Sequence, residues 1–205
     1  MNDVVNAVLL TEVFVTLFVI MDPPGTIPVF LSLTSGRSPA TIRKAAWQAV
    51  AVSFFVVTVF AFFGQGILRY MHISIPALQG AGGLLLLLVA LELLTGNEKE
   101  PTATQDVNIA LVPLGTPLLA GPGAIVAVML FVQRVDSVAT FVAVALGVVL
   151  VHVALWLAMR FSVNILKVIR ESGVLLVTRI AGLLLSAIAV QMVADSVRAF
   201  VNGEG

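Results

Sequence analysis

A lone aspartate lies inside a long apolar stretch and is followed at once by residues that break helices. The segment reads DPPGTIP over residues 22–28. A carboxylate in hydrocarbon costs several kcal/mol unless it is paired, hydrated or protonated, so Asp22 is a candidate proton carrier or partner of a ligand ammonium. The alternative role is structural, because Asp22 can cap a new half-helix that has proline in its first turn. The two roles are compatible.

A second group of breakers, AGPGAI at residues 120–125, has no side chain that could cap a helix. A half-helix that starts there would expose backbone N–H groups, and its N-terminus would carry about half a positive charge, which suits a carboxylate. We expect donors between Gly121 and Ala124 and acceptors from Asp22 and the unwound carbonyls, a combination that fits a zwitterion. Glycine also lets a ligand approach the backbone closely. The predicted substrate-binding residues are Asp22, Pro24, Gly25, Thr26, Thr116, Gly121, Pro122, Gly123 and Ala124.

Further polar residues in apolar segments are candidates for a pathway or for proton coupling, together with Asp22. Glu92 and Gln191 occupy equivalent places late in two predicted spans, although an interfacial position is favoured for Glu92. His152 lies in mid-span, where an interhelical hydrogen bond is favoured over a proton relay. Glu12 lies near the outer end of its span, either in a vestibule or at the surface. The two histidines are far apart and there is no cysteine, so no metal site and no cofactor is predicted.

The composition places these residues in lipid. The chain has 205 residues, of which 60% are hydrophobic and 11% are charged, and its formal net charge is zero. A soluble domain is about half apolar and about a quarter charged. The composition therefore excludes an ordinary cytosolic enzyme, a disordered chain and a nucleic-acid binder. We expect a single transmembrane domain over residues 1–205, with the lipid bilayer as its surroundings.

Six transmembrane helices are predicted, because about 20 apolar helical residues cross a hydrocarbon core of about 30 Å. The spans cover residues 7–34, 45–68, 70–91, 107–133, 137–159 and 174–197. The first span should persist in the mature protein, since the N-terminus has no basic region and no small-x-small cleavage pattern.

The helix breakers indicate an internal repeat. A shift of 98 residues places Pro24-Gly25 on Pro122-Gly123, and a shift of 99 places Gly83 and its leucines on Gly182 and its leucines. Each repeat, about 1–97 and about 106–205, contains three spans, so the second copy must enter the membrane from the opposite side. We predict an all-α polytopic fold of two inverted three-helix repeats with discontinuous first and fourth helices. Two ordinary proline kinks are the alternative.

Basic residues predict the orientation, because they are enriched in cytoplasmic loops. Three lie on the side of the termini: Arg69, Arg134 and Arg198. Eight lie on the other side: Arg37, Arg43, Lys44, Lys99, Arg160, Lys167, Arg170 and Arg179. We expect both termini outside.

Both breaks resemble motifs of a known family. DPPGTIPVF at residues 22–30, followed by Leu33-Thr34, resembles the DPxGxxPxF…LT pattern of the MarC family of bacterial inner-membrane proteins, and PLLAGPGAI at residues 117–125 resembles its second motif. The resemblance covers essentially the whole chain. It implies two inverted three-helix repeats within the superfamily of LysE-type exporters, with the two motifs forming the substrate site. The SnatA-like branch of the family is associated with small neutral amino acids such as glycine and alanine.

The preferred hypothesis is a secondary transporter of a small neutral amino acid that works by alternating access, with proton coupling through Asp22 as an option. The chain has no Walker A motif, so ATP is not its direct energy source. A channel, an exporter of another small solute and a membrane protein without transport activity are the alternatives. An intramembrane hydrolase is disfavoured, because an aspartyl dyad needs two deep carboxylates. We therefore do not expect an enzyme.

Overall fold

The computed structural model describes residues 2–34, 36–95 and 119–203, and these ranges are helical apart from short turns. The helices are α1 (Asn2–Met21), α2 (Pro23–Leu33), α3 (Pro39–Tyr70), α4 (Ile75–Thr95), α5 (Pro122–Gln133), α6 (Val138–Arg160) and α7 (Ser162–Val201). Within the described ranges, five helical stretches are long and apolar enough to cross a membrane, and Gly123–Gln133 is a shorter apolar helix. The predicted all-α polytopic fold is confirmed. The first part of the predicted fourth span, residues 107–118, lies outside the described residues.

Large apolar side chains cover the outside of the bundle. Phe55 is 67% exposed, and Phe63, Leu88 and Leu183 are also more than half exposed. A soluble monomer rarely leaves such an extended apolar surface in water. The surrounding solvent of these faces is therefore lipid.

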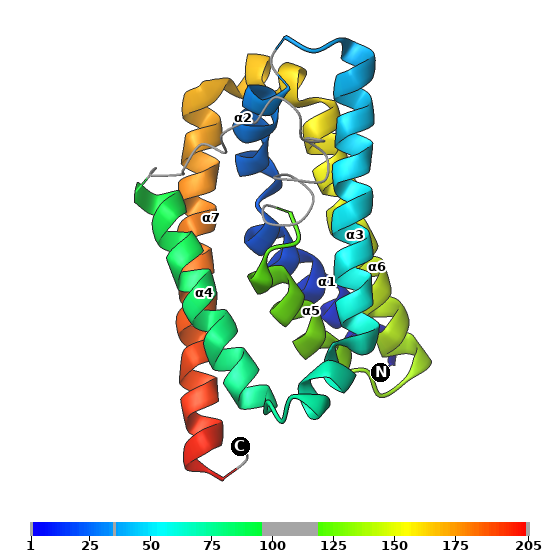
Figure 1. Cartoon of the computed structure of the whole chain (residues 1–205), viewed down its shortest axis with the longest axis vertical. Helices are drawn as coiled ribbons and strands as arrows, with labels where there is room; N and C mark the ends of the chain where they lie inside the picture. Colours follow the sequence, from blue (N-terminus) through cyan, green and yellow to red (C-terminus); the bar gives the residue numbers. More distant parts are fainter. Residues whose placement is uncertain (1, 35, 96–118, 204–205) are drawn as a thin grey trace.

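The chain crosses the bundle in alternating directions (Figure 1). α1 and α2 together run from the end with the N-terminus to the opposite end, α3 returns, and α4 runs away again. α5, α6 and α7 follow the reverse pattern, and both termini lie at the same end as the turns at residues 71–74 and 134–137. Corresponding helices of the two halves are thus antiparallel.

The contacts of α4 with α7 repeat with an offset of 99 residues. A Cβ placed on Gly83 would lie 2.8 Å from the carbonyl oxygen of Ala189, and one placed on Gly182 would lie 3.3 Å from that of Ala90. The other neighbours correspond in the same way: Met192 and Val193 at Gly83, and Leu93 and Leu94 at Gly182. Such reciprocal contacts are expected around a pseudo-two-fold axis, so the two halves are inverted repeats.

The second transmembrane span of each repeat, α3 in the first and α6 in the second, begins in the same way. The Ser38 hydroxyl accepts a hydrogen bond from the Thr41 N–H at 3.3 Å, and the Ser137 hydroxyl accepts one from the Thr140 N–H at 3.2 Å. A serine N-cap satisfies a backbone donor that a helix start leaves open. These caps fix where α3 and α6 begin, and they again lie 99 residues apart.

The predicted boundary between the second and third spans is wrong. α3 continues to Tyr70, and the turn at residues 71–74 contains His72 with φ 56°, so α4 begins at Ile75 rather than at residue 70. The predicted start of the last span at residue 174 agrees with the membrane-crossing stretch Ser172–Val201, although helix α7 begins earlier, at Ser162, and is kinked at Arg170, where φ is 61° and ψ is 165°. The predicted spans used charge-free runs as their limits, but a helix continues where its backbone hydrogen bonds continue, whatever the charge of its side chains.

Candidate functional site

The first break is a single residue, Asp22, between α1 and α2. Its N–H donates to the Phe18 carbonyl at 3.0 Å, and its carbonyl accepts from the Thr26 N–H at 3.0 Å. Its φ of 39° lies in the left-handed region, which is unusual for a residue other than glycine and is tolerated best by Asn and Asp. Such local strain is commonly found at functional sites. The predicted discontinuity of the first span is confirmed.

The Asp22 carboxylate lies inside the protein, over the start of α2. Asp22 is 6% exposed and, among the side chains whose burial is described, it is the one buried acid or base of the Asp, Glu, Lys and Arg types. A Cβ on Gly25 would lie 2.8 Å from Asp22 Cγ and 3.1 Å from the Thr178 hydroxyl oxygen of α7. The lack of a side chain at Gly25 therefore gives the carboxylate its place beside the backbone of α2 and beside α7.

The hydroxyl of Thr26 is used locally. Thr26 is 5% exposed, and its Oγ1 donates to the Pro23 carbonyl at 2.7 Å. Without this bond, the Pro23 carbonyl could accept hydrogen bonds only from backbone N–H groups of the helix. The hydroxyl supplies a further donor and so stabilises the start of α2. The Thr26 hydroxyl could then act towards a ligand only as a hydrogen-bond acceptor. Pro24, two residues before Thr26, is half-buried.

The second break ends at Gly121, which is the N-cap of α5 and forms no side-chain cap. The absence of a capping side chain is as predicted, and Pro122 occupies the first turn. The N–H groups of Ala124 and Ile125 both donate to the Gly121 carbonyl, at 3.0 and 3.2 Å. Because Ala124 already donates to backbone and proline has no N–H, the expected set of donors narrows to Gly121 and Gly123.

The two breaks lie together inside the bundle. A Cβ on Gly123 would lie 3.5 Å from Ile20 Cγ2 of α1, two residues before the first break. Leu119 is 0% and Ala124 is 1% exposed, and both belong to the apolar cluster that contains Phe30. The break between α1 and α2 and the start of α5 lie at the same mid-height of the molecule (Figure 1). Thr116, predicted to join this site, lies outside the described residues.

Protein side chains fill the space beside both glycines. The Leu86 side chain of α4 packs on Gly123, with Leu86 Cγ 2.9 Å from the position of an added Cβ, just as the Asp22 carboxylate packs on Gly25. The expectation that these glycines leave the backbone open to a ligand therefore needs correction. In this conformation they provide room for Leu86 and Asp22.

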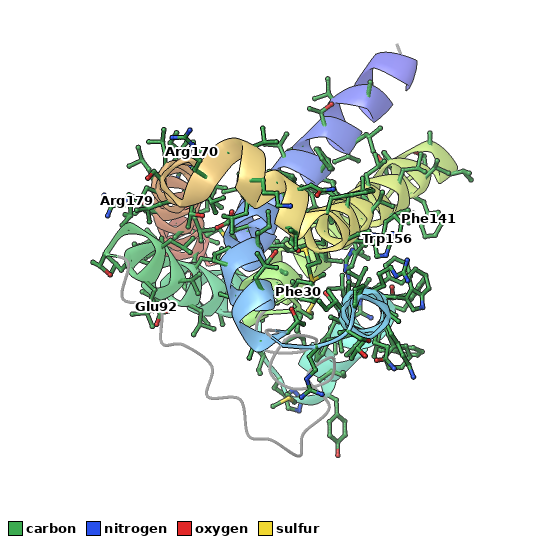
Figure 2. The ribbon with its side chains drawn as sticks, turned by 90° about the horizontal axis from the view of Figure 1, so that it is seen from above. Phe30, Glu92, Phe141, Trp156, Arg170 and Arg179 are labelled. Carbon is green, nitrogen blue, oxygen red and sulfur yellow. The ribbon has the colours of Figure 1, made fainter. Side chains whose placement is uncertain are left out.

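The predicted pathway pair Glu92 and Gln191 does not reach this site. Both side chains are exposed, and Gln191 Nε2 donates to Asp195 Oδ1 at 2.9 Å on the surface of α7. Figure 2 shows Glu92 at the rim of the bundle, away from Phe30 near its centre. Glu92 and Gln191 are equivalent by the repeat offset of 99 residues, but both lie on outward-pointing faces of their helices.

His152 joins α6 to α3. Its Nε2 lies 3.2 Å from Ser53 Oγ, its Nδ1 lies 2.8 Å from the Val148 carbonyl oxygen, and the Phe54 ring packs edge-on against it with the centroids 5.2 Å apart. His152 is 4% exposed and Ser53 is 0% exposed. This is the interhelical hydrogen bond favoured from the sequence, and both nitrogens are within hydrogen-bond distance of protein groups.

Replacing Ser53 by alanine should lower the stability of the purified protein by about 0.5–1.5 kcal/mol, because a buried hydrogen bond between helices is lost. The apparent melting temperature in detergent should fall accordingly. Transport should keep its pH dependence, because the hydrogen bonds of His152 go to Ser53 and to the Val148 carbonyl rather than to residues of the two breaks. A changed pH profile in Ser53→Ala would instead assign His152 to proton transfer.

Glu12 forms an ion pair at the end of the bundle. Its two carboxylate oxygens accept from Arg134 Nη1 and Nη2 at 2.5 and 3.0 Å, and both side chains are substantially exposed. The hydrogen bonds from this guanidinium to Glu12 raise the pKa of Arg134. The pair ties α1 to the turn after α5, so Glu12 is held at the surface.

Among the buried hydroxyl residues that sequence reasoning missed, Ser53 and Thr178 contact the predicted functional residues or their neighbours. Ser53 lies 99 residues before its partner His152, so the repeat offset is a signal that could have paired them. Thr178 adjoins Arg179, which was assigned to the cytoplasmic side, and this charge concealed a hydroxyl that faces the first break. Periodicity along α7 could have placed the two on different faces.

Comparisons with known proteins agree with this architecture. The family described as "MarC family integral membrane protein" matches residues 7–201. A "UPF0056 membrane protein" of Aquifex aeolicus is 36% identical over 200 residues, which cover 93% of each chain. "UPF0056 membrane protein MJ1677" of Methanocaldococcus jannaschii is 35% identical over 192 residues, which cover 90% of this chain and 94% of the relative. "UPF0056 membrane protein YhcE" of Escherichia coli is 31% identical over 199 residues, which cover 93% of this chain and 92% of the relative.

No solved structure matches the chain significantly. The family match extends over nearly the whole sequence and includes both breaks, each of the two repeats and the helices that carry them. The chain therefore belongs to the MarC family of integral membrane proteins.

Proposed function

We propose that this protein is a secondary transporter of small neutral amino acids such as glycine and alanine. The observation that carries the proposal is the placement of a buried carboxylate, Asp22, in the same interior region as the uncapped N-terminus of α5. One break supplies negative charge and the other supplies N–H donors and the positive end of a helix dipole. An amino acid carries the complementary charges.

In the proposed binding mode, the substrate ammonium interacts with Asp22 and with carbonyls of the first break. The substrate carboxylate accepts from the N–H groups of Gly121 and Gly123. A charge-assisted hydrogen bond contributes about 1.5–3 kcal/mol, so a few such bonds offset the loss of hydration of a zwitterion. Discontinuous helices hold substrates in this way in many transporters.

The packing of the interior supports a small substrate. Leu86 and Ile20 occupy the space beside Gly123, and Thr178 approaches Gly25 from α7. A ligand with a long side chain would have to displace Leu86, which is 2% exposed. Glycine and alanine need the least rearrangement of these neighbours.

Alternating access follows from the inverted repeats in this proposal. The two halves can exchange their packing about the α4–α7 contact, which opens the central site to one side at a time.

We place the protein in the inner membrane with both termini outside. The distribution of basic residues supports that orientation, and the common end of the two termini in Figure 1 is compatible with it.

The test is counterflow in proteoliposomes that contain the purified full-length chain. Vesicles preloaded with unlabelled glycine should accumulate labelled glycine transiently, and alanine should compete whereas lysine should not. A carrier saturates with substrate, but a channel gives flux without saturation or counterflow. No glycine or alanine flux above empty vesicles would contradict the proposal.

A further inference from the structure

A cavity lies in the half of the bundle that holds the turns at residues 71–74 and 134–137. Its volume is about 450 Å³, and it is lined by α3 over residues 54–65, by α5 and the following turn over residues 128–135, and by α6 over residues 141–148. None of the break residues lines it. It is therefore distinct from the site proposed for the amino acid.

The mouth of the cavity lies on the lipid-facing surface. Phe62 of α3 and Phe141 of α6 line it and are 65% and 47% exposed. Figure 2 shows Phe141 at the periphery of the bundle. Both residues lie inside helices that are long and apolar enough to cross a membrane. A molecule dissolved in the bilayer can enter from the side without passing through water.

The polarity of the lining changes with depth. Gln65 and Gln133 lie near the helix ends, whereas the opposite end is formed by Phe54, Val57 and Val148, with the hydroxyl of Thr58 next to Val57. Among the described residues that line the cavity, none is charged. This gradient fits an amphipathic molecule with its polar group near the interface and its hydrocarbon towards the bilayer centre.

Gln133 supplies a buried donor without a partner. Its Nε2 is shielded from solvent and makes no hydrogen bond within the described part of the chain. A buried polar group without a partner costs about 1–3 kcal/mol. A turn of the Gln133 side chain would present the amide to a ligand carbonyl in the cavity and remove this cost.

The cavity lies between α3 of the first repeat and α5 and α6 of the second, and it results from small side chains on this one side of the pseudo-two-fold axis. Val57 and Val128 line it, and their repeat equivalents are Trp156 and Phe30. Phe30 is 0% exposed and packs in the apolar core with Trp156 against it. The counterpart region is thus filled by aromatic rings, so the fold itself does not require an open cavity here.

We propose that this cavity binds an acyl chain of a bilayer glycerolipid, whose ester carbonyl accepts a hydrogen bond from the Gln133 amide. The chain lies between α3, α5 and α6 with its methyl end towards Phe54. The inference does not depend on the proposed transport function, because it uses none of the residues of the two breaks.

The experiment uses the full chain in nanodiscs of phosphatidylethanolamine and phosphatidylglycerol, doped with a phospholipid that carries a diazirine in its acyl chain. Crosslinks are mapped by mass spectrometry and should concentrate at residues 54–65 and 128–148. Ala145→Phe fills the cavity and should strongly reduce this labelling. Val149→Phe adds the same ring on the exposed face of the same helix and should leave it unchanged.

A second variant tests the hydrogen bond and distinguishes a lipid from any other hydrocarbon. Gln133→Leu should lower phospholipid labelling about two- to tenfold, which corresponds to the loss of one hydrogen bond. Labelling by a diazirine-bearing alkane, which has no acceptor, should not fall. Equal losses for both probes would overturn the proposal.

Three other outcomes would also overturn it. Crosslinks distributed evenly over outward residues such as Phe55 and Phe63 would show annular lipid only. Unchanged labelling in Ala145→Phe would show that the cavity is not occupied. Displacement of the label by glycine would assign the cavity to an amino-acid pathway instead.

Discussion

Replacing Asp22 by asparagine should reduce the initial rate of glycine counterflow by about tenfold to a hundredfold, which corresponds to the loss of one charge-assisted hydrogen bond of about 1.5–3 kcal/mol. Asparagine retains the size of the side chain, tolerates a positive φ and caps helices as well as aspartate does. The break at φ 39° should therefore survive, and the change isolates the negative charge. If Asp22 also carries the proton, the pH dependence of transport should flatten.

The matched control is Asp195→Asn, which makes the same chemical change on the surface of α7. Asp195 accepts from Gln191 and lies away from the breaks, so its loss should leave the rate and the pH profile unchanged. Equal thermal stability of the two variants would show that folding is not the cause of a difference in rate. If Asp22→Asn transports glycine like the parent at every pH, Asp22 is only a structural cap.

The breaks and the inverted repeats were predictable from sequence because they depend on backbone chemistry. Proline lacks an N–H, and a carboxylate in lipid needs a specific reason to be there, so residues 22–28 and 120–125 were identifiable without any knowledge of packing. The offset of 99 also matched Gly83 with Gly182, and the structure shows that the neighbours of these two glycines correspond at the same offset. Periodic signals of this kind survive in a composition dominated by leucine and valine.

The sequence did not predict equally well which side chains point into the bundle. Glu92 and Gln191 share the repeat offset but point outward, since the offset defines equivalence and does not define which helix face is buried. Leu86 belongs to a run of five leucines in which every residue looks alike, yet it alone packs on Gly123. A run without polar residues has almost no hydrophobic periodicity, so only the packed structure identifies the leucine that closes the second break.

Gly123→Ala should lower stability by about 1–3 kcal/mol, because its methyl group would overlap the Leu86 side chain in a tightly packed interior. Leu86→Ala alone should cost about 2–5 kcal/mol, since it truncates a buried leucine. The double variant should lose less than the sum of the two single losses, because the shorter side chain leaves room for the new methyl group. The measurement is the apparent melting temperature of the parent, both single variants and the double variant in one detergent. The two changes should thus be non-additive, as expected for residues in direct contact.

Gly66→Ala provides the control, since a Cβ there meets no atom within 4 Å and alanine is favoured over glycine in a helix. That variant should melt at or above the parent temperature. Additive losses in the Gly123 and Leu86 variants would contradict direct packing between the two residues.

The equivalent position in the other repeat should behave differently, because a methyl group at Gly25 would meet the Asp22 carboxylate instead of a leucine. Gly25→Ala should therefore impair transport more than stability. Comparing this variant with Gly123→Ala would distinguish the polar half of the proposed site, at Gly25, from its tightly packed half, at Gly123.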